Sequence, residues 1–204
     1  ELAEKLEPAE PGLYMLKKEY SLQRPSILGQ SRPRFVISGE ISSIYKKNGR
    51  VRKVHSLILL PSLEAAEVLS RRLEAIGNIH SDGRPILGLD CHDLLAITLE
   101  ACPDAIYVPA HIWTPHFSLF GAFSGFDTIE EGYEELTPQI HALETGLSSD
   151  PAMNGRLSAL DSFQLISNSD AHSPAKLGRE ASLFDIPMSY AGLYGAIQRG
   201  EGLK

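Results

Sequence analysis

The chain has 204 residues, of which 43% are apolar and 22% charged, and its net charge is −7. These totals suit one ordinary domain or a large part of a larger one, and they exclude a surface that is basic all over. Two cysteines, Cys91 and Cys102, are too few for a disulfide scaffold. With no signal peptide and no apolar run near the roughly 18 residues of a membrane span, the sequence predicts a cytoplasmic protein without membrane contact.

The first twelve residues, ELAEKLEPAEPG, resemble the end of a helix. Leu2 and Leu6 lie at helical spacing, no N-cap residue precedes them, and Pro8 and Pro11 follow. We therefore expect the last turns of a helix that begins outside the sequence. On this basis residues 1–204 are predicted to be a single domain cut from a longer protein.

Strand-like and helix-like segments alternate along the rest of the chain. Short apolar runs rich in β-branched residues predict strands over 35–40, 54–60, 85–90, 105–111, 140–146 and 163–167. Apolar residues at helical spacing predict helices over 62–77, 92–101, 128–136, 153–162 and 189–200. Ser62 and Thr128 are the expected N-caps of the first and third of these helices. This order predicts an α/β fold with a mainly parallel sheet, either open or closed into a barrel.

Polar side chains stand at the carboxyl ends of several predicted strands, where ligands and catalytic groups collect in parallel α/β folds. Glu40 ends the first strand, His111 the fourth and Glu144 the fifth, and Asp170 and His172 follow the last. An Asp-x-His pair in an extended segment shares one face and offers an oxygen and a nitrogen to a metal such as Zn²⁺ or Mn²⁺. Capping of the next turn is the alternative role of the aspartate. The Glu144 carboxylate is open to three interpretations: orienting a metal-bound histidine, capping a helix, or pairing with an arginine.

A hairpin turn adds a geometric prediction. Asn48-Gly49 is a strong signal for a two-residue turn, which makes paired positions sum to 97. Glu40 then lies opposite Leu57 and becomes a diagonal neighbour of His55, about 7–8 Å away at the backbone. Side chains of that length can converge on one ion, although an ordinary cross-strand polar pair explains the pattern as well.

Basic residues cluster on the hairpin, where Arg52 and Lys53 are candidate contacts to phosphate or DNA, and again after the Asp-x-His motif, at Lys176 and Arg179. The second pair lies nearer the predicted metals, so it is the better candidate for binding a substrate phosphate. A solvated surface is the alternative for the hairpin.

The motifs GE, VH, PAH and SNSDAHS, in this order, resemble those of the polymerase and histidinol phosphatase (PHP) metal-dependent phosphoesterases. Longer segments, among them EISSIYKKNGRVRKVHSLILLPS, VPAHIWTPHFSLFG, ETGLSSDPAMNGRLSALD and ISNSDAHSPAKLGREA, resemble the endonuclease Q branch of that family. The resemblance implies an α/β fold that is part of a distorted seven-stranded β/α barrel, TIM-like and lacking its first strand or strands. It also implies a DNA-repair endonuclease that nicks on the 5′ side of uracil, hypoxanthine, xanthine or abasic sites.

The resemblance implies up to three divalent metals, Zn²⁺, Mn²⁺ or Mg²⁺, in the intact domain. Glu40 matches a carboxylate that bridges two metals, His55 and His111 match ligands of the second metal, and Asp170 and His172 match ligands of the first and third. Glu40 and Asp170 are thereby the predicted catalytic residues. The family's opening His-x-His motif and its Cys-rich zinc and helical region are missing from these 204 residues. We therefore expect this chain to hold metal poorly and to be inactive by itself.

Two other functions fit the sequence. A PHP-type phosphatase acting on a small phosphomonoester uses the same chemistry. A metal-free DNA-binding or scaffold module would use the same polar residues to hydrogen-bond one another. The chain has no G-x-x-x-x-G-K-[ST] loop, so no ATP partner is expected. The predicted partner is DNA that contains damaged bases, bound through a local basic patch.

Overall fold

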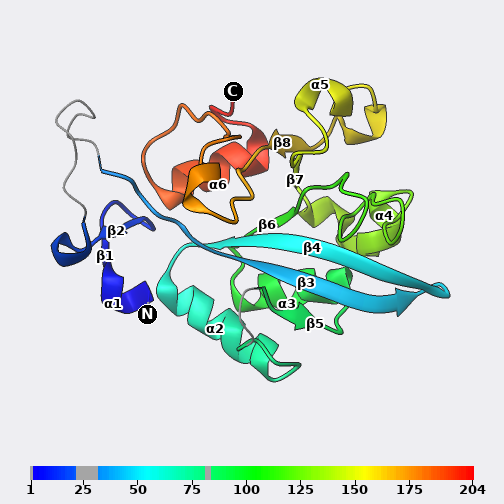
Figure 1. The fold of residues 1–204 in the computed structure, drawn as a ribbon, viewed down its shortest axis with the longest axis horizontal. Helices are drawn as coiled ribbons and strands as arrows, with labels where there is room; N and C mark the ends of the chain where they lie inside the picture. The colour runs from blue at the N-terminus through cyan, green and yellow to red at the C-terminus, as the bar shows by residue number, and fades with distance from the viewer. Residues whose placement is uncertain (1, 22–31, 81–83) are drawn as a thin grey trace.

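A mixed α/β fold is formed by the residues that the computed structural model describes, which are 2–21, 32–80 and 84–204 (Figure 1). Its centre is a four-stranded sheet of order β5-β3-β4-β6. The strands of this sheet are β3 (Ile37–Lys47), β4 (Arg50–Leu60), β5 (Ile86–Leu87) and β6 (Ile106–Pro109). Two further pairs of strands are β1 (Leu6–Pro8) with β2 (Tyr14–Leu16), and β7 (Ala142–Glu144) with β8 (Gln164–Ile166). Strand β7 lies beside β6, so the second pair continues the layer of the main sheet.

The longest strands, β3 and β4, form the predicted hairpin. Asn48 and Gly49 adopt φ values of 52° and 76°, as the left-handed positions of a two-residue turn require. Lys47 pairs with Arg50, and the register continues without a bulge to Ile37 opposite Leu60. The register inferred from the Asn-Gly turn is therefore confirmed over the full length of the hairpin.

The sheet is mixed, where a mainly parallel sheet was predicted. β3 and β4 are antiparallel, as are β4 and β6, whereas β3 with β5 and β7 with β8 are parallel. The predicted tight turn reverses the chain between β3 and β4, so these two strands are antiparallel. The α/β class is confirmed, but the described residues form no closed barrel.

Side-chain caps define where the helices begin. The hydroxyl of Ser62 accepts a hydrogen bond from the Ala65 backbone amide, and Thr128 does the same for Glu131, so both predicted N-caps are confirmed. The helices are α1 (Leu2–Lys5), α2 (Leu63–Glu74), α3 (Cys91–Ala101), α4 (Ile129–Tyr133), α5 (Pro151–Asn154) and α6 (Tyr190–Arg199). Short 3₁₀ turns cover Lys18–Tyr20, Glu134–Gln139, Ser158–Leu160 and Pro174–Lys176.

Several predicted helices are shorter in the structure, and the helix expected over 128–136 becomes a 3₁₀ turn after Tyr133. The helix expected over 153–162 is replaced by α5, capped by Asp150, and by a separate 3₁₀ turn; Gly155 ends α5. At the start of the chain the helical segment stops at Lys5, because Leu6 begins a strand that pairs with β2. Strand pairing takes precedence there over the helical spacing of the apolar residues.

Both faces of the main sheet are covered, which explains the nearly continuous apolar run at the end of β4. Figure 1 shows α6 on one side of the sheet and α2 and α3 on the other. Alternation along the strand sends Leu59 into the core with α6 and Ile58 into the larger core that includes α2 and α3. Tyr107 and Val108 of β6 are divided between the two cores in the same way.

Candidate metal centre

Three side chains from three segments meet at the main sheet. Glu40 comes from β3, His55 from β4, and His111 from the bend that follows β6. Oε1 of Glu40 lies 2.9 Å from Nδ1 of His55 and 3.4 Å from Nε2 of His111. The two imidazoles approach to 3.1 Å between the same nitrogens. The predicted convergence of these three residues is confirmed.

The hairpin register brings two of the three together. Glu40 lies opposite Leu57, and His55 lies opposite Ser42, so Glu40 and His55 are diagonal neighbours on one face. Both residues lie within long strands, where the sequence predicted Glu40 at a strand end. The backbones of the paired strands hold these two side chains more firmly than a loop would.

The donor atoms of this trio suit a divalent cation. One ligand atom from each of Glu40, His55 and His111 lies within 4.8 Å of the other two. Oε1 of Glu40 is buried and makes no hydrogen bond of good geometry, so its lone pairs are available to an ion. Two imidazole nitrogens with one carboxylate oxygen are typical ligands of Zn²⁺ and Mn²⁺, and a set of only three leaves coordination positions for water or substrate. The trio therefore fits a metal.

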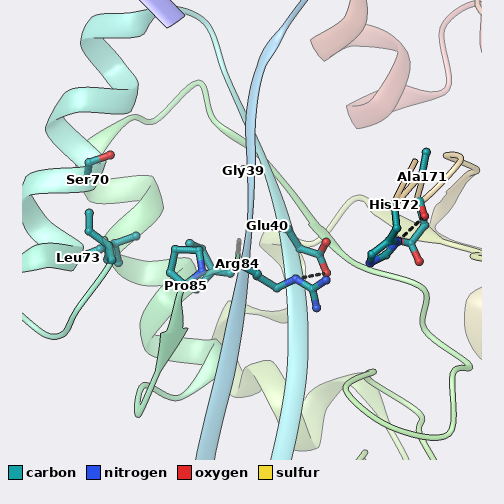
Figure 2. Close-up of a pocket in the computed structure, with 11 residues that line it drawn as sticks. Gly39, Glu40, Ser70, Leu73, Arg84, Pro85, Ala171 and His172 are labelled. Atoms are coloured by element: carbon teal, nitrogen blue, oxygen red, sulfur yellow. Dashed lines mark hydrogen bonds and ion pairs between the residues drawn. The ribbon is translucent and has the colours of Figure 1, made fainter. Parts of the chain in front are cut away.

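Arg84, to which no sequence motif assigned a role, also reaches this cluster. Its Nε lies 3.2 Å from Oε1 of Glu40 (Figure 2). Its Nη1 lies 2.7 and 2.8 Å from the two ring nitrogens of His55. Ser42 pairs with Ile86 in the parallel strands β3 and β5. Two residues before each of them, Glu40 and Arg84 therefore lie side by side. No local pattern reveals that register, so the sequence contained no usable signal for this contact.

Burial and neighbouring charges shift the pKa values of Glu40, His55 and His111 in different directions. Burial alone would raise the pKa of Glu40, but the imidazoles of His111 and His55 and the charge of Arg84 outweigh it and hold that pKa well below its usual range. Burial lowers the pKa of His55, and Arg84 lowers it further. Burial would also lower the pKa of His111, but Glu40 and Glu144 raise it overall. At neutral pH the cluster thus contains an ionised carboxylate and a neutral His55, both of which are metal-binding forms.

Glu144 holds His111 in place. Its Oε2 accepts a hydrogen bond of 2.8 Å from the backbone amide of His111, and its Oε1 accepts one of 2.8 Å from the side chain of Asn168. Burial raises the pKa of this carboxyl group. Of the three roles left open by the sequence, the structure supports an orienting role, exerted on the backbone of the histidine.

Asp170 and His172 lie next to the trio, outside the compact group that the described residues form. Asp170 has a left-handed φ of 44°, so the segment is not extended and the predicted alternation of faces does not apply. Asp170 and Glu40 both line two adjoining pockets of about 480 and 280 Å³, and His172 lines the larger one. The His172 Nδ1 lies 2.9 Å from the Asp170 carbonyl oxygen, and its side chain is 74% exposed.

The basic side chains predicted to bind phosphate differ in their exposure and in the contacts that they already make. Arg179 donates two hydrogen bonds, of 2.7 and 3.0 Å, to the carbonyl oxygens of Ser169 and Asp170, and it thereby braces the loop that carries Asp170. Lys176 is exposed at the end of its 3₁₀ turn. The ammonium of Lys53 lies 5.1 Å from the centre of the Phe117 ring, which packs against His55.

Arg52 is buried, which corrects its assignment as a DNA contact. It is 7% exposed, its guanidinium lies 4.3 Å above the Phe126 ring, and it donates to the carbonyl oxygen of Gly125. Alternation along β4 turns this side chain toward the loop that contains Phe126 and away from solvent.

We expect Arg52→Leu to lower the free energy of unfolding by about 1–2 kcal/mol, because a cation–π contact and a hydrogen bond are lost. Arg50→Leu is the matched control, since Arg50 is exposed in the same strand. Urea denaturation of both variants measures the difference. A weaker affinity of Arg52→Leu for DNA at unchanged stability would contradict the structural role.

Comparison with known proteins gives one curated relative of uncharacterized function. YqxK of Bacillus subtilis (strain 168), described as an uncharacterized protein, is 34% identical over 130 residues, which are 62% of this chain and 32% of that protein. The chain therefore spans about a third of the length of the curated relative that it matches. No family model matches the chain. No solved structure matches it.

Among the residues that the structure describes, no helix has both the length and the apolar character needed to cross a bilayer.

Proposed function

We propose that the chain belongs to a divalent-metal-dependent phosphoesterase that hydrolyses phosphodiester bonds in DNA. The observation that carries this proposal is the trio of Glu40, His55 and His111, whose donor atoms lie within 4.8 Å of one another. Glu40 of this trio lines the same two pockets as Asp170. A three-ligand site that borders an open pocket has the form of a catalytic metal site, in which substrate or water completes the coordination. The proposal includes the PHP-type barrel that the sequence resembles, of which β3 to β8 would form a part.

Each residue of the site has a proposed role in this reaction. Glu40, His55 and His111 hold the cation, and Glu144 fixes the position of His111 through its backbone amide. A divalent ion bound there supplies a Lewis acid for a phosphoryl oxygen and lowers the pKa of a bound water. Asp170, which lines both pockets, would orient the reacting groups, which is the catalytic role proposed for it. His172 lines the larger pocket from the same loop.

DNA is the proposed substrate because an exposed lysine and exposed aromatic rings occur on the segments that follow Asp170 and His111. Lys176 is exposed on the loop that follows Asp170, and Lys53 lies above Phe117 near His55. In the segment after β6 the rings of His116 and Phe123 stack with centres 4.4 Å apart, and Phe123 is 72% exposed. Exposed aromatic rings suit stacking with nucleobases taken out of a duplex, and lysine side chains suit its phosphates. Uracil, hypoxanthine, xanthine and abasic sites, with a cut on the 5′ side, are the lesions that the resemblance suggests.

Activity of the intact protein tests this function. We expect Mn²⁺-dependent nicking of a duplex with a single uracil, lost on adding EDTA and reduced about 100-fold in Asp170→Ala, a cost at the upper end for groups around a metal. Asp161→Ala, at an exposed turn, is the matched control. Undiminished nicking by Asp170→Ala would contradict the proposed role of Asp170. Release of phosphate from p-nitrophenyl phosphate, with the duplex left intact, would indicate a phosphomonoesterase.

A metal-free DNA-binding module is the second candidate, and the position of Arg84 favours it. Its guanidinium provides a positive charge to Glu40 and His55 without an ion. For such a module, affinity for the uracil duplex in a gel-shift titration is the same in EDTA and in Mn²⁺. For the phosphoesterase we expect tighter binding with metal.

A further inference from the structure

Arg84 places a positive charge beside the residues that a metal ion would need. Its Nε lies 3.2 Å from Oε1 of Glu40, and its Nη1 lies 2.7 Å from Nδ1 of His55. A guanidinium group is always positively charged, so at this position it neutralises Glu40 and opposes the binding of a second cation at Glu40 and His55.

The same arginine also borders the larger pocket. That pocket, of about 480 Å³, is lined by Arg84 together with Glu40, Asp170 and His172. Figure 2 shows the Arg84 side chain reaching from beside Pro85 to Glu40, with His172 and Ala171 on the far side of Glu40. The Arg84 side chain is 28% exposed, so the guanidinium is not enclosed by the protein on the side of the pocket.

We propose that Arg84 is a two-position anion-binding residue, which neutralises Glu40 in the absence of metal and binds a phosphate oxygen in the pocket once a metal ion has displaced it. This inference rests on the proposed metal site. The Arg84 guanidinium would be repelled from Glu40 and His55 by a divalent ion bound there. The freed group has the planar, fixed charge that recognises phosphate.

The two-position role predicts opposite effects of one variant on two ligands. Removing an internal competitor raises the apparent affinity for metal, because a larger fraction of the protein has its site open. We expect Arg84→Ala to bind Mn²⁺ about tenfold more tightly than wild type, within the usual range of couplings between two equilibria. Inorganic phosphate should bind the Mn²⁺-saturated variant about tenfold more weakly than Mn²⁺-saturated wild type, because a charge-assisted contact is lost.

Electron paramagnetic resonance of free Mn²⁺ measures the first quantity without any assay of activity, and isothermal titration with phosphate measures the second. Arg72→Ala is the matched control, since Arg72 is a half-exposed arginine on α2 that pairs with Glu100. Arg84→Lys keeps the charge but loses the planar fork, and should fall between wild type and Arg84→Ala for both ligands. Circular dichroism confirms that each variant is folded.

The possible results distinguish a wrong role for Arg84 from a wrong assignment of the metal site. If Arg84→Ala binds Mn²⁺ no more tightly than wild type, the proposed role of Arg84 is wrong. The metal site itself is still supported in that case, provided that binding by wild type depends on Glu40. Unchanged phosphate affinity in Arg84→Ala would also overturn it. Absence of Mn²⁺ binding in wild type and in Arg84→Ala would overturn the metal site itself, and the inference with it.

Discussion

Replacing Glu40 with alanine is expected to reduce binding of Mn²⁺ or Zn²⁺ by about 100-fold or more, since loss of even an outer partner of a metal ligand commonly costs 10–100-fold. Glu40 is the only carboxylate in the compact trio, and its Oε1 is the atom closest to both imidazoles. Without it, two neutral imidazoles remain, and they provide no negative charge to offset that of the cation. Glu40→Ala should also lose the contact with Arg84.

Bound metal per chain, measured after equilibrium dialysis against Zn²⁺ or Mn²⁺, tests this prediction. Glu67→Ala is the matched control, because Glu67 is an exposed glutamate on α2 that pairs with Arg71 on the same helix. In the intact protein we expect stoichiometric metal in the control and almost none in Glu40→Ala. Equal amounts in wild type and Glu40→Ala would show that any bound metal lies elsewhere.

The second large effect is expected at Gly146, which lies directly against His111. Gly146 has a φ of +62°, and a Cβ atom built on it would lie 2.5 Å from Cβ and 2.8 Å from Cα of His111. Alanine there has an unfavourable backbone conformation and also pushes His111 away from Glu40. We expect Gly146→Ala to lower the free energy of unfolding by about 2–3 kcal/mol.

Gly49→Ala separates the two effects. Gly49 has a similar φ of +76°, but nothing lies within 4 Å of the position of its Cβ. We expect it to cost only about 1 kcal/mol, the backbone part, and to leave metal binding unchanged. Urea denaturation and metal dialysis of both variants provide the comparison. Equal losses of stability, with metal binding intact in both, would show that the contact with His111 has no effect on the site.

Local signals in the sequence determined the parts of the site that lie on one hairpin. The Asn48-Gly49 turn specifies a register, and that register by itself makes Glu40 and His55 diagonal neighbours. The caps at Ser62 and Thr128 were also predictable, since a side-chain oxygen and a nearby backbone amide are only three residues apart. Such interactions depend on a few consecutive residues, so the sequence alone specifies them.

Contacts between distant segments were decided only by the tertiary structure. Arg84 reaches Glu40 because β5 pairs with β3 in one particular register, and Glu144 holds His111 because β7 lies beside β6. The burial of Arg52 against Phe126 arises in the same way. Strand order and register between segments depend on packing of the whole chain, so turn signals and hydrophobic periodicity could not have revealed these contacts.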